Sequence, residues 1–497
     1  MDAAAARTAP RGRARLTGIL VPMTQDTDLR TRLRRRVRLA VAAGLALAVA
    51  LPVLPGPAAA QSASRRAPAP APVRAQPVLP DPELAEALRR SGGIPREVER
   101  FYAARDWAPL WVANGRVGRA ADTLIDLIRT ARLDGLDPES YRLRPILDAI
   151  DRSTDGSPRS LARAEMLLTR GFIALARDMA RPRDVGVIYA DAELRPDAPD
   201  PGDLLRRAGG APALGAWLER IGWMNPVYAD LRMAAIAWIG EGDVRDRDPD
   251  KVRLIRTNLD RARALPEGHG GRFVLVDAAA ARLWMYDQGR VVDTMRVVVG
   301  KPTDPTPMMA ALIRYAAINP YWNLPPDLVP SRVAQGVLAR GPSHLKARNY
   351  EILSDWTEDA RILPASAVDW RAVADGRTEL RVRQRPGPGN PMGRIKFMFP
   401  NEQGVYLHDT NEKGLLRGGE RLFSAGCVRV EDAPRLARWL FGRPVPLTGT
   451  QPERRVDLPG AVPVYLTYLT ASAVDGKLVF RDDVYGRDDA GGGYRTR

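Results

Sequence analysis

The sequence of 497 residues contains a single cysteine, Cys427, and only three histidines. A lone cysteine has no partner within the chain, which excludes an internal disulfide. The three histidines, His269, His344 and His408, do not show the His-Glu-x-x-His spacing that is typical of zinc sites. We therefore expect neither a metal ion nor another cofactor.

Lysine is scarce, and the formal net charge of +16 comes mainly from arginine. The arginines are spread along the chain and do not form a basic stripe interleaved with aromatic residues, the pattern expected of a nucleic-acid surface. Nucleic acid is therefore not an expected partner. Weak attraction to an anionic polymer is compatible with the charge.

Long apolar runs are absent beyond the first sixty residues. Arg30 to Arg38 form a basic segment, Leu39 to Leu54 follow as an apolar run, and Ala58 to Ala60 supply small residues of the type found at cleavage sites. The run is short for a spanning helix and is interrupted by Pro52. We expect residues 1–60 to be a signal peptide and the mature protein to be periplasmic. An uncleaved inner-membrane anchor is the alternative, and Met23 is an alternative start.

The next segments have different periodicities. Residues 61–80 are rich in Ala and Pro, which predicts a disordered linker. Residues 81–255 carry apolar stripes of helical spacing, for example Leu124, Leu127 and Ile128. We expect a helical domain there, whose aromatic residues Phe101, Tyr102, Trp107 and Trp111 belong to its core.

From residue 256 the apolar period changes to two. Short β runs are predicted at 273–277, 282–286, 295–299, 394–399 and 404–408, and a helix at 433–440. The pattern between 323 and 381 is mixed and helical. We expect residues 256–487 to form a mainly β domain in which His408 lies at a strand end, followed by a disordered tail at 488–497.

Cys427 lies in a context that favours chemistry. A cysteine nucleophile needs a nearby base to form thiolate, and His408 is the natural supplier. Gly426, directly before the cysteine, allows a tight turn whose N–H groups can face a carbonyl oxygen under attack. The alternative is that Cys427 is a small buried apolar residue and His408 a strand histidine with satisfied hydrogen bonds.

The pattern of His408 followed, after a spacer, by Ser424-Ala425-Gly426-Cys427-Val428-Arg429 resembles the active-site signature of the L,D-transpeptidases, cysteine enzymes that remodel bacterial peptidoglycan. Many members have histidine where this chain has Ala425. The large, capped Gram-negative subgroup accepts a small residue there, and the resemblance to it extends over most of residues 95–487, including segments 297–302, 319–325, 385–397, 463–468 and 482–486.

The resemblance implies an α+β multidomain protein, with a helical scaffold at 81–255 and a catalytic domain at 256–487 that carries a capping insertion at about 323–381. It implies that the Cys427 thiolate attacks a stem-peptide amide, releases D-alanine and passes the acyl group to a diaminopimelate amine, forming 3-3 crosslinks, with His408 as the base. Carbapenem-type β-lactams would act as inhibitors.

The resemblance also assigns binding roles. Gly426 and Tyr406 are expected at the oxyanion, Arg429 at a substrate carboxylate or in a surface ion pair, and Trp322 and Asn390 in the pocket wall. Asp409 receives no role, because neighbouring residues on a strand point to opposite faces.

Several alternatives stay open. The same acyl chemistry could anchor an envelope protein through a lysine, or hydrolyse stems with water as the acceptor. A non-catalytic wall-binding scaffold is the rival from another class. Ser343-His344-Leu345-Lys346 matches the Ser-x-x-Lys pattern of penicillin-binding proteins, but no Lys-Thr-Gly follows it. Relatives often carry a peptidoglycan-binding domain near residue 240, where this chain has only the short charged stretch 240–251.

Overall fold

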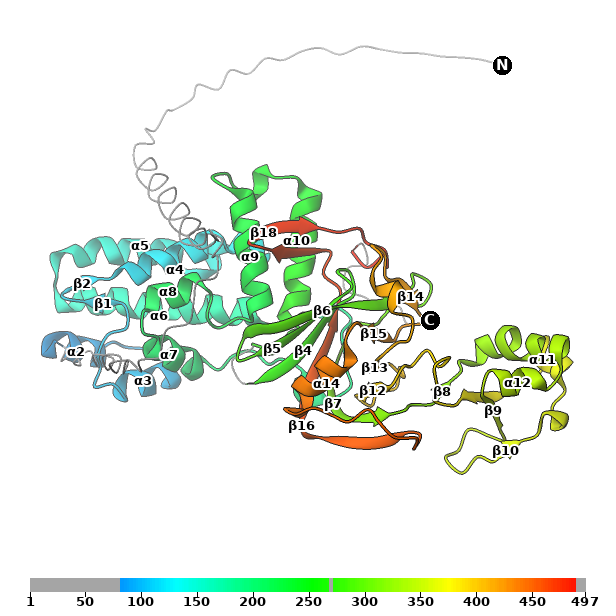
Figure 1. The fold of residues 1–497 in the computed structure, drawn as a ribbon. Coiled ribbons are helices and arrows are strands. Elements are labelled where there is room, and N and C mark those ends of the chain that lie inside the picture. The colour runs from blue at the N-terminus through cyan, green and yellow to red at the C-terminus, as the bar shows by residue number, and fades with distance from the viewer. Residues whose placement is uncertain (1–80, 268–270, 489–497) are drawn as a thin grey trace, which may run out of the picture. The chain divides into compact units, whose positions relative to one another are not determined.

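The computed structural model describes residues 81–267 and 271–488 (Figure 1). The expected signal peptide, the linker and all but the first residue of the expected tail lie outside this part of the chain. None of the helices in the described ranges is both long enough and apolar enough to cross a membrane.

The first part of the described chain is helical, as expected (Figure 1). Its helices are α2 (Pro82–Arg89), α3 (Arg96–Ala103), α4 (Arg119–Arg129), α5 (Leu143–Arg152), α6 (Pro158–Ala180), α7 (Pro201–Gly210), α8 (Leu214–Glu219), α9 (Pro226–Ile239) and α10 (Pro249–Arg263). Several begin in the same way: a side-chain oxygen caps the first backbone N–H groups, and proline takes the first helical position, where no N–H is needed. The capping residues include Ser157, Asn225 and Asp248.

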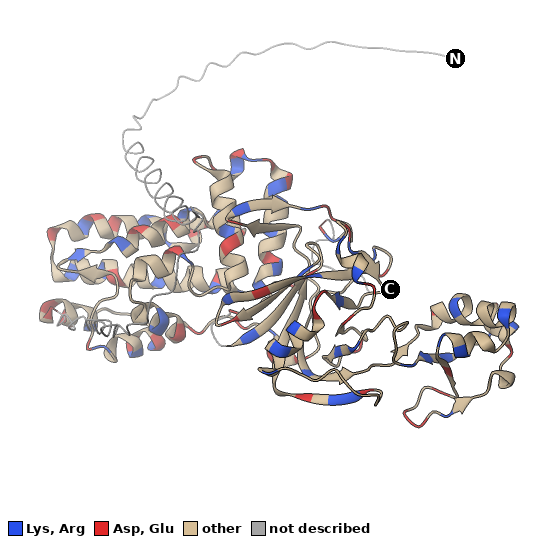
Figure 2. Ribbon diagram, in the orientation of Figure 1, with Lys and Arg blue, Asp and Glu red and all other residues tan. Residues whose placement is uncertain are grey.

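The helices share one apolar core. Phe172 of α6 lies edge-on to Trp111 and to Trp223, with ring centroids 5.9 and 5.4 Å apart. Tyr102 and Trp111 are almost fully buried, which confirms the prediction that the early aromatic residues belong to the core. Basic and acidic residues are both scattered over the helices and strands (Figure 2).

Helices α9 and α10 are joined directly. Only a short 3₁₀ turn, Val244–Asp246, lies between Ile239 and Pro249. The segment 240–251 therefore holds no separate domain.

The β-rich part of the chain is a sheet in the order β12-β13-β15-β6-β5-β4-β16-β7-β3, and β12 also pairs with β7, so its strands close into a barrel-like ring. The strands are β3 (Ile188–Tyr189), β4 (Arg272–Asp277), β5 (Arg282–Asp287), β6 (Arg290–Gly300), β7 (Met309–Ile318), β12 (Ile395–Met398), β13 (Leu407–His408), β15 (Val428–Val430) and β16 (Arg454–Thr467). β14 (Leu422–Ser424) pairs in parallel with β6. Helix α14 (Ala433–Phe441) buries Leu436 and Leu440 against the core of the ring.

Strand β13 is shorter than the predicted run 404–408. The side chain of Asn401 explains the difference: its amide donates to the carbonyl of Val405 at 2.8 Å and accepts from the N–H of Val405 at 3.1 Å. These backbone groups are therefore unavailable to the sheet, and pairing begins only at Leu407.

The insertion forms a small unit with its own core. A four-stranded antiparallel sheet in the order β10-β9-β11-β8 is accompanied by three short helices. Its elements are β8 (Trp322–Asn323), α11 (Gln335–Arg340), α12 (Ser343–Ala347), β9 (Tyr350–Leu353), β10 (Ile362–Leu363), α13 (Trp370–Ala374) and β11 (Arg381–Gln384). A last hairpin consists of β17 (Ala471–Val474) and β18 (Lys477–Phe480). It packs on α9, where the ring centroids of Phe480 and Trp238 are 6.3 Å apart.

A buried ion pair holds α9 against the turn after α4. Arg232 donates to both carboxylate oxygens of Asp134, at 3.1 and 2.9 Å, and both side chains are at most 1% exposed. The Tyr228 hydroxyl bonds to the same carboxylate.

We predict that Arg232→Met lowers the free energy of unfolding by roughly 3–5 kcal/mol, because it leaves the Asp134 carboxylate buried without its charge partner. Urea unfolding followed by circular dichroism measures the change. The matched control is Arg206→Met, whose ion pair with Asp203 is 67% and 58% exposed and should contribute far less. Equal losses in the two variants would contradict the prediction.

Candidate functional site

The pairing of β13 with β15 brings the predicted cysteine and histidine segments together. The two strands run parallel, with Leu407 opposite Val428 and His408 opposite Arg429. Leu407 and Val428 are fully buried in the core of the ring. Because side chains alternate along a strand, His408 and Arg429 lie on the opposite face, together with Tyr406 and Cys427.

A lysine that the sequence did not single out completes this face. Lys396 of β12 lies directly opposite His408. Its ammonium group is 3.0 Å from a carboxylate oxygen of Glu453 and lies over the ring of Tyr406, 5.9 Å from the ring centroid. Two cations, Lys396 and Arg429, therefore flank the histidine across three adjacent strands.

His408 is held as a neutral base. Its Nδ1 lies 2.6 Å from the backbone carbonyl of Asp409, and a carbonyl can only accept, so Nδ1 carries the proton and Nε2 keeps its lone pair. Burial and the positive charge of Arg429 lower the pKa of His408 to about 3. The imidazole is therefore uncharged at neutral pH.

Cys427 is a neutral thiol in this state. Burial raises the pKa of its thiol, and hydrogen bonding to Tyr406 and the charges of Arg429 and Lys396 only partly oppose the rise. The Tyr406 ring lies 5.7 Å from the His408 ring. Burial and the adjacent Cys427 raise the pKa of Tyr406, so its hydroxyl keeps its proton and remains a donor.

The turn before the cysteine is left-handed. Gly426 has φ of 101°, a conformation that favours glycine. The Ser424 hydroxyl donates to the carbonyl of Cys427, and Val428 N–H donates to Tyr406 at 3.1 Å. Within the described residues, the N–H groups of Gly426 and Cys427 donate to no protein oxygen. They are thus available to an oxyanion, the role expected for Gly426 and its neighbour.

The carboxylate of Asp409 points away from the imidazole, as strand alternation predicts. It accepts from Arg394 N–H at 3.0 Å and from the Lys413 ammonium at 2.8 Å, and it packs so closely on Gly393 that no Cβ would fit there. The backbone carbonyl of Asp409, not its side chain, orients His408. The sequence could not indicate this contact, because every residue has a backbone carbonyl and no residue type marks the one that is used.

The remaining candidates have other contacts. Arg429 pairs with the exposed Glu412, and its buried Nε has no hydrogen-bond partner among the described residues. Asn390 is 1% exposed, and its amide donates to Pro320 O at 3.0 Å and accepts from Met392 N–H at 2.8 Å. These bonds show that Asn390 supports its own loop, and its expected place in the pocket wall stays a prediction.

Trp322 lies on β8, packs on the core of the insertion, and has Arg332 over its ring at 5.8 Å. Its side chain is half-buried, and its expected place in the pocket wall stays a prediction. Ser343, the serine of the Ser-x-x-Lys pattern, begins helix α12, and its hydroxyl donates a hydrogen bond to the carbonyl of Arg340 at 2.7 Å.

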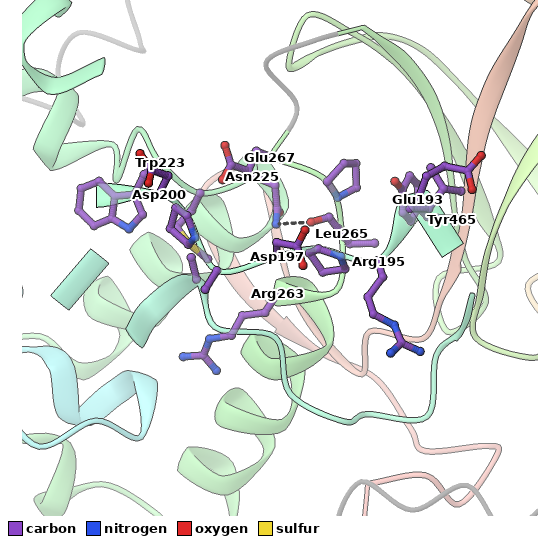
Figure 3. A pocket seen from close by; sticks show the side chains of 17 residues that line it. Glu193, Arg195, Asp197, Asp200, Trp223, Asn225, Arg263, Leu265, Glu267 and Tyr465 are labelled. Carbon is purple, nitrogen blue, oxygen red and sulfur yellow. Dashed lines mark hydrogen bonds between the residues drawn. The ribbon is translucent and has the colours of Figure 1, made fainter. Parts of the chain in front are cut away.

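The surface also carries a pocket of about 400 Å³ in another place (Figure 3). Its lining includes Glu193, Arg195, Trp223 and Tyr465 and none of the residues on the cysteine face. Within 81–267 and 271–488, no three His, Cys, Asp or Glu side chains gather closely enough to hold a metal ion.

The thiol and the imidazole thus lie on the same face of the β ring, beside N–H groups that have no protein acceptor among the described residues. Residues 271–453 match the L,D-transpeptidase catalytic domain family, and residues 96–234 match the scaffold domain family. The chain therefore contains an L,D-transpeptidase catalytic domain, preceded by a scaffold domain.

A protein of Haemophilus influenzae, whose own description as an L,D-transpeptidase is provisional, is 25% identical over 403 residues, which are 78% of this chain and 77% of that protein.

Solved structures of L,D-transpeptidases are more distant. One from Mycobacterium smegmatis is 15% identical, with a TM-score of 0.20, and covers 39% of this chain and 58% of that chain. L,D-transpeptidase 1 of Mycobacterium tuberculosis is 13% identical, with a TM-score of 0.16, and the match covers 40% of this chain and 61% of that chain. The chain thus spans about three fifths of these structures, and the family assignment comes from the sequence matches.

The charge state of the site predicts its reactivity. Since the pKa of Cys427 is raised, the reactive thiolate should be scarce at neutral pH, and the rate of alkylation by iodoacetamide should climb about tenfold per pH unit up to and beyond pH 8.5. Mass spectrometry of the intact protein over pH 5–10 measures this rate. A fast, pH-independent rate below pH 6 would instead indicate a preformed thiolate–imidazolium pair.

Proposed function

We propose that this protein is a peptidoglycan L,D-transpeptidase that forms 3-3 crosslinks. The observation that supports the proposal most strongly is the common face of Tyr406, His408, Cys427 and Arg429, which lies within a catalytic domain of this family. Such a site joins a nucleophile, a neutral base and oxyanion donors.

Acylation begins from two neutral groups. As the Cys427 sulfur attacks the carbonyl of an L-centred stem amide, its proton passes to Nε2 of His408. The negative charge that develops on the carbonyl oxygen is stabilised by the N–H groups of Gly426 and Cys427, with the Tyr406 hydroxyl as a third donor. The low pKa of His408 makes the imidazolium a strong acid, which returns the proton to the departing amine of D-alanine.

The thioester then reacts with an amine. The side-chain amine of a second stem's diaminopimelate attacks the thioester carbonyl, and His408 accepts the proton that the amine loses. The carbon–sulfur bond breaks, a new amide forms, and the thiol regains its proton. Arg429, whose partner Glu412 is exposed, is positioned to exchange that partner for a substrate carboxylate.

The acceptor decides between related functions. A protein lysine in place of diaminopimelate would anchor an envelope protein, and water would give a hydrolase. We propose the crosslinking reaction, in the periplasm, after export by the N-terminal segment. Carbapenem-type β-lactams should acylate Cys427 by the same chemistry.

The direct test is to incubate the purified protein with disaccharide-tetrapeptides and to analyse the products by mass spectrometry. Release of D-alanine with tripeptide–tetrapeptide dimers is the expected result, and Cys427→Ser should form neither product. Tripeptide monomers alone would identify a hydrolase. No reaction with any stem, from a protein whose thiol still reacts with iodoacetamide, would overturn the proposal.

Substitutions at the neighbouring residues His408 and Asp409 should differ sharply in their effect on activity. His408→Gln removes the base and should lower kcat by roughly 100- to 10,000-fold. Asp409→Asn keeps the backbone carbonyl that orients His408 and keeps an oxygen for Arg394 N–H, so it should retain activity within about tenfold. Dimer formation measures both, and circular dichroism checks folding. Equal inactivity of two folded variants would show that the Asp409 carboxylate takes part.

A further inference from the structure

A buried threonine far from the signature motif holds the catalytic turn. Thr306 is fully buried, and its hydroxyl donates to the carbonyl of Gly426 at 2.8 Å while it accepts from Gly300 N–H at 2.9 Å. The hydroxyl thus links the end of β6 to the residue before the nucleophile.

The direction of this hydrogen bond matters because the peptide unit is planar. The carbonyl of Gly426 and the N–H of Cys427 belong to one trans peptide, so they point in opposite directions. When Thr306 holds the carbonyl, it also aims the Cys427 N–H. Gly426 needs such a restraint, since glycine allows conformations that other residues exclude and its φ is already 101°.

Thr306 is itself fixed from several sides. A Cβ at Gly300 would lie 2.2 Å from the carbonyl oxygen of Asp304, so the loop folds back on Gly300 with no room to shift. The Tyr485 hydroxyl donates to the Gly300 carbonyl at 2.6 Å, and the guanidinium of Arg487 donates to the Thr306 carbonyl at 3.0 Å. The rigid loop can therefore impose its geometry on the turn.

We propose that Thr306 is a positioning residue that aims the Cys427 N–H at the oxyanion of the tetrahedral intermediate. For the natural acyl donor this inference rests on the proposed function. It applies equally to any acyl donor whose carbonyl the thiol attacks.

The test compares two reactions of the same thiol in the full-length protein. With p-nitrophenyl acetate, a carbon–sulfur bond forms, the carbon–oxygen bond breaks, nitrophenolate leaves, and the intermediate carries an oxyanion. Alkylation by iodoacetamide displaces iodide and passes through no oxyanion. Nitrophenolate release, corrected for the background of Cys427→Ser, gives the acylation rate, and intact-protein mass spectrometry gives the alkylation rate.

We expect Thr306→Val to slow acylation by roughly 10- to 100-fold, less than the ~100- to 1,000-fold loss when an oxyanion donor is removed outright, with alkylation unchanged within about twofold. Thr306→Ser restores the hydroxyl and should restore acylation. The matched control is Thr303→Val in the same loop, which should affect neither rate. Among the described residues, the exposed Thr303 hydroxyl has Asp304 as its hydrogen-bond partner.

Equal losses of both reactions in Thr306→Val, or acylation at the wild-type rate, would overturn the inference. Tyr485→Phe removes the hydrogen bonds of the Tyr485 hydroxyl to Gly300 and to Thr306 but keeps the Thr306 hydroxyl, and it should show a smaller loss of the same kind. A wild-type protein that reacts with the ester but releases no D-alanine from stems would refute the proposed function, and the Thr306 comparison would still be decided.

Discussion

The parallel pairing of β13 and β15 is the constraint on which the site depends. It is brief, with Leu407 against Val428 and His408 against Arg429, and two such short strands would not hold together alone. They are stable because β12 and β6 flank them and because their inward side chains are fully buried in the ring. The apolar face that drives folding leaves the opposite face for the thiol and the imidazole, since strand side chains alternate.

The electrostatics of that face suit a reaction that creates charge only transiently. Burial keeps both Cys427 and His408 neutral at rest, while Lys396 and Arg429 lie close enough to lower the pKa of the thiol. Arg429 also makes a protonated imidazole less stable and thereby favours its return of the proton. Each cation is balanced by a carboxylate, Glu453 or Glu412, so the resting site holds no isolated buried charge.

The scaffold helices are tied to the catalytic ring by polar contacts that converge on the C-terminal segment. Arg261 of α10 donates to the Tyr468 carbonyl at 3.1 Å and to the Arg487 carbonyl at 2.8 Å, and Asn258 donates to the Thr470 hydroxyl at 2.9 Å. Arg487 in turn holds the loop of Thr306. A continuous set of hydrogen bonds thus connects the helical domain with the turn that carries the nucleophile.

The sequence by itself determined the local features. Apolar periodicity separated the helical part from the β part, and the helix after the cysteine, α14, was predicted at 433–440. The scarcity of cysteine and histidine, together with the signature motif, predicted Cys427 and His408 as the reactive pair. These features depend on residues near one another in the chain, which is why they could be read from residue types alone.

Only the tertiary structure decided which groups support that pair. Thr306 meets Gly426 across 120 positions of sequence, and Lys396 reaches His408 through a strand pairing that no local pattern encodes. Asp409 contributes a backbone carbonyl, which has no signature in the sequence, and the buried amide of Asn390 supports its own loop. The physical reason is common to all four: sheet register and loop packing place these groups, and both arise only when distant segments pack together.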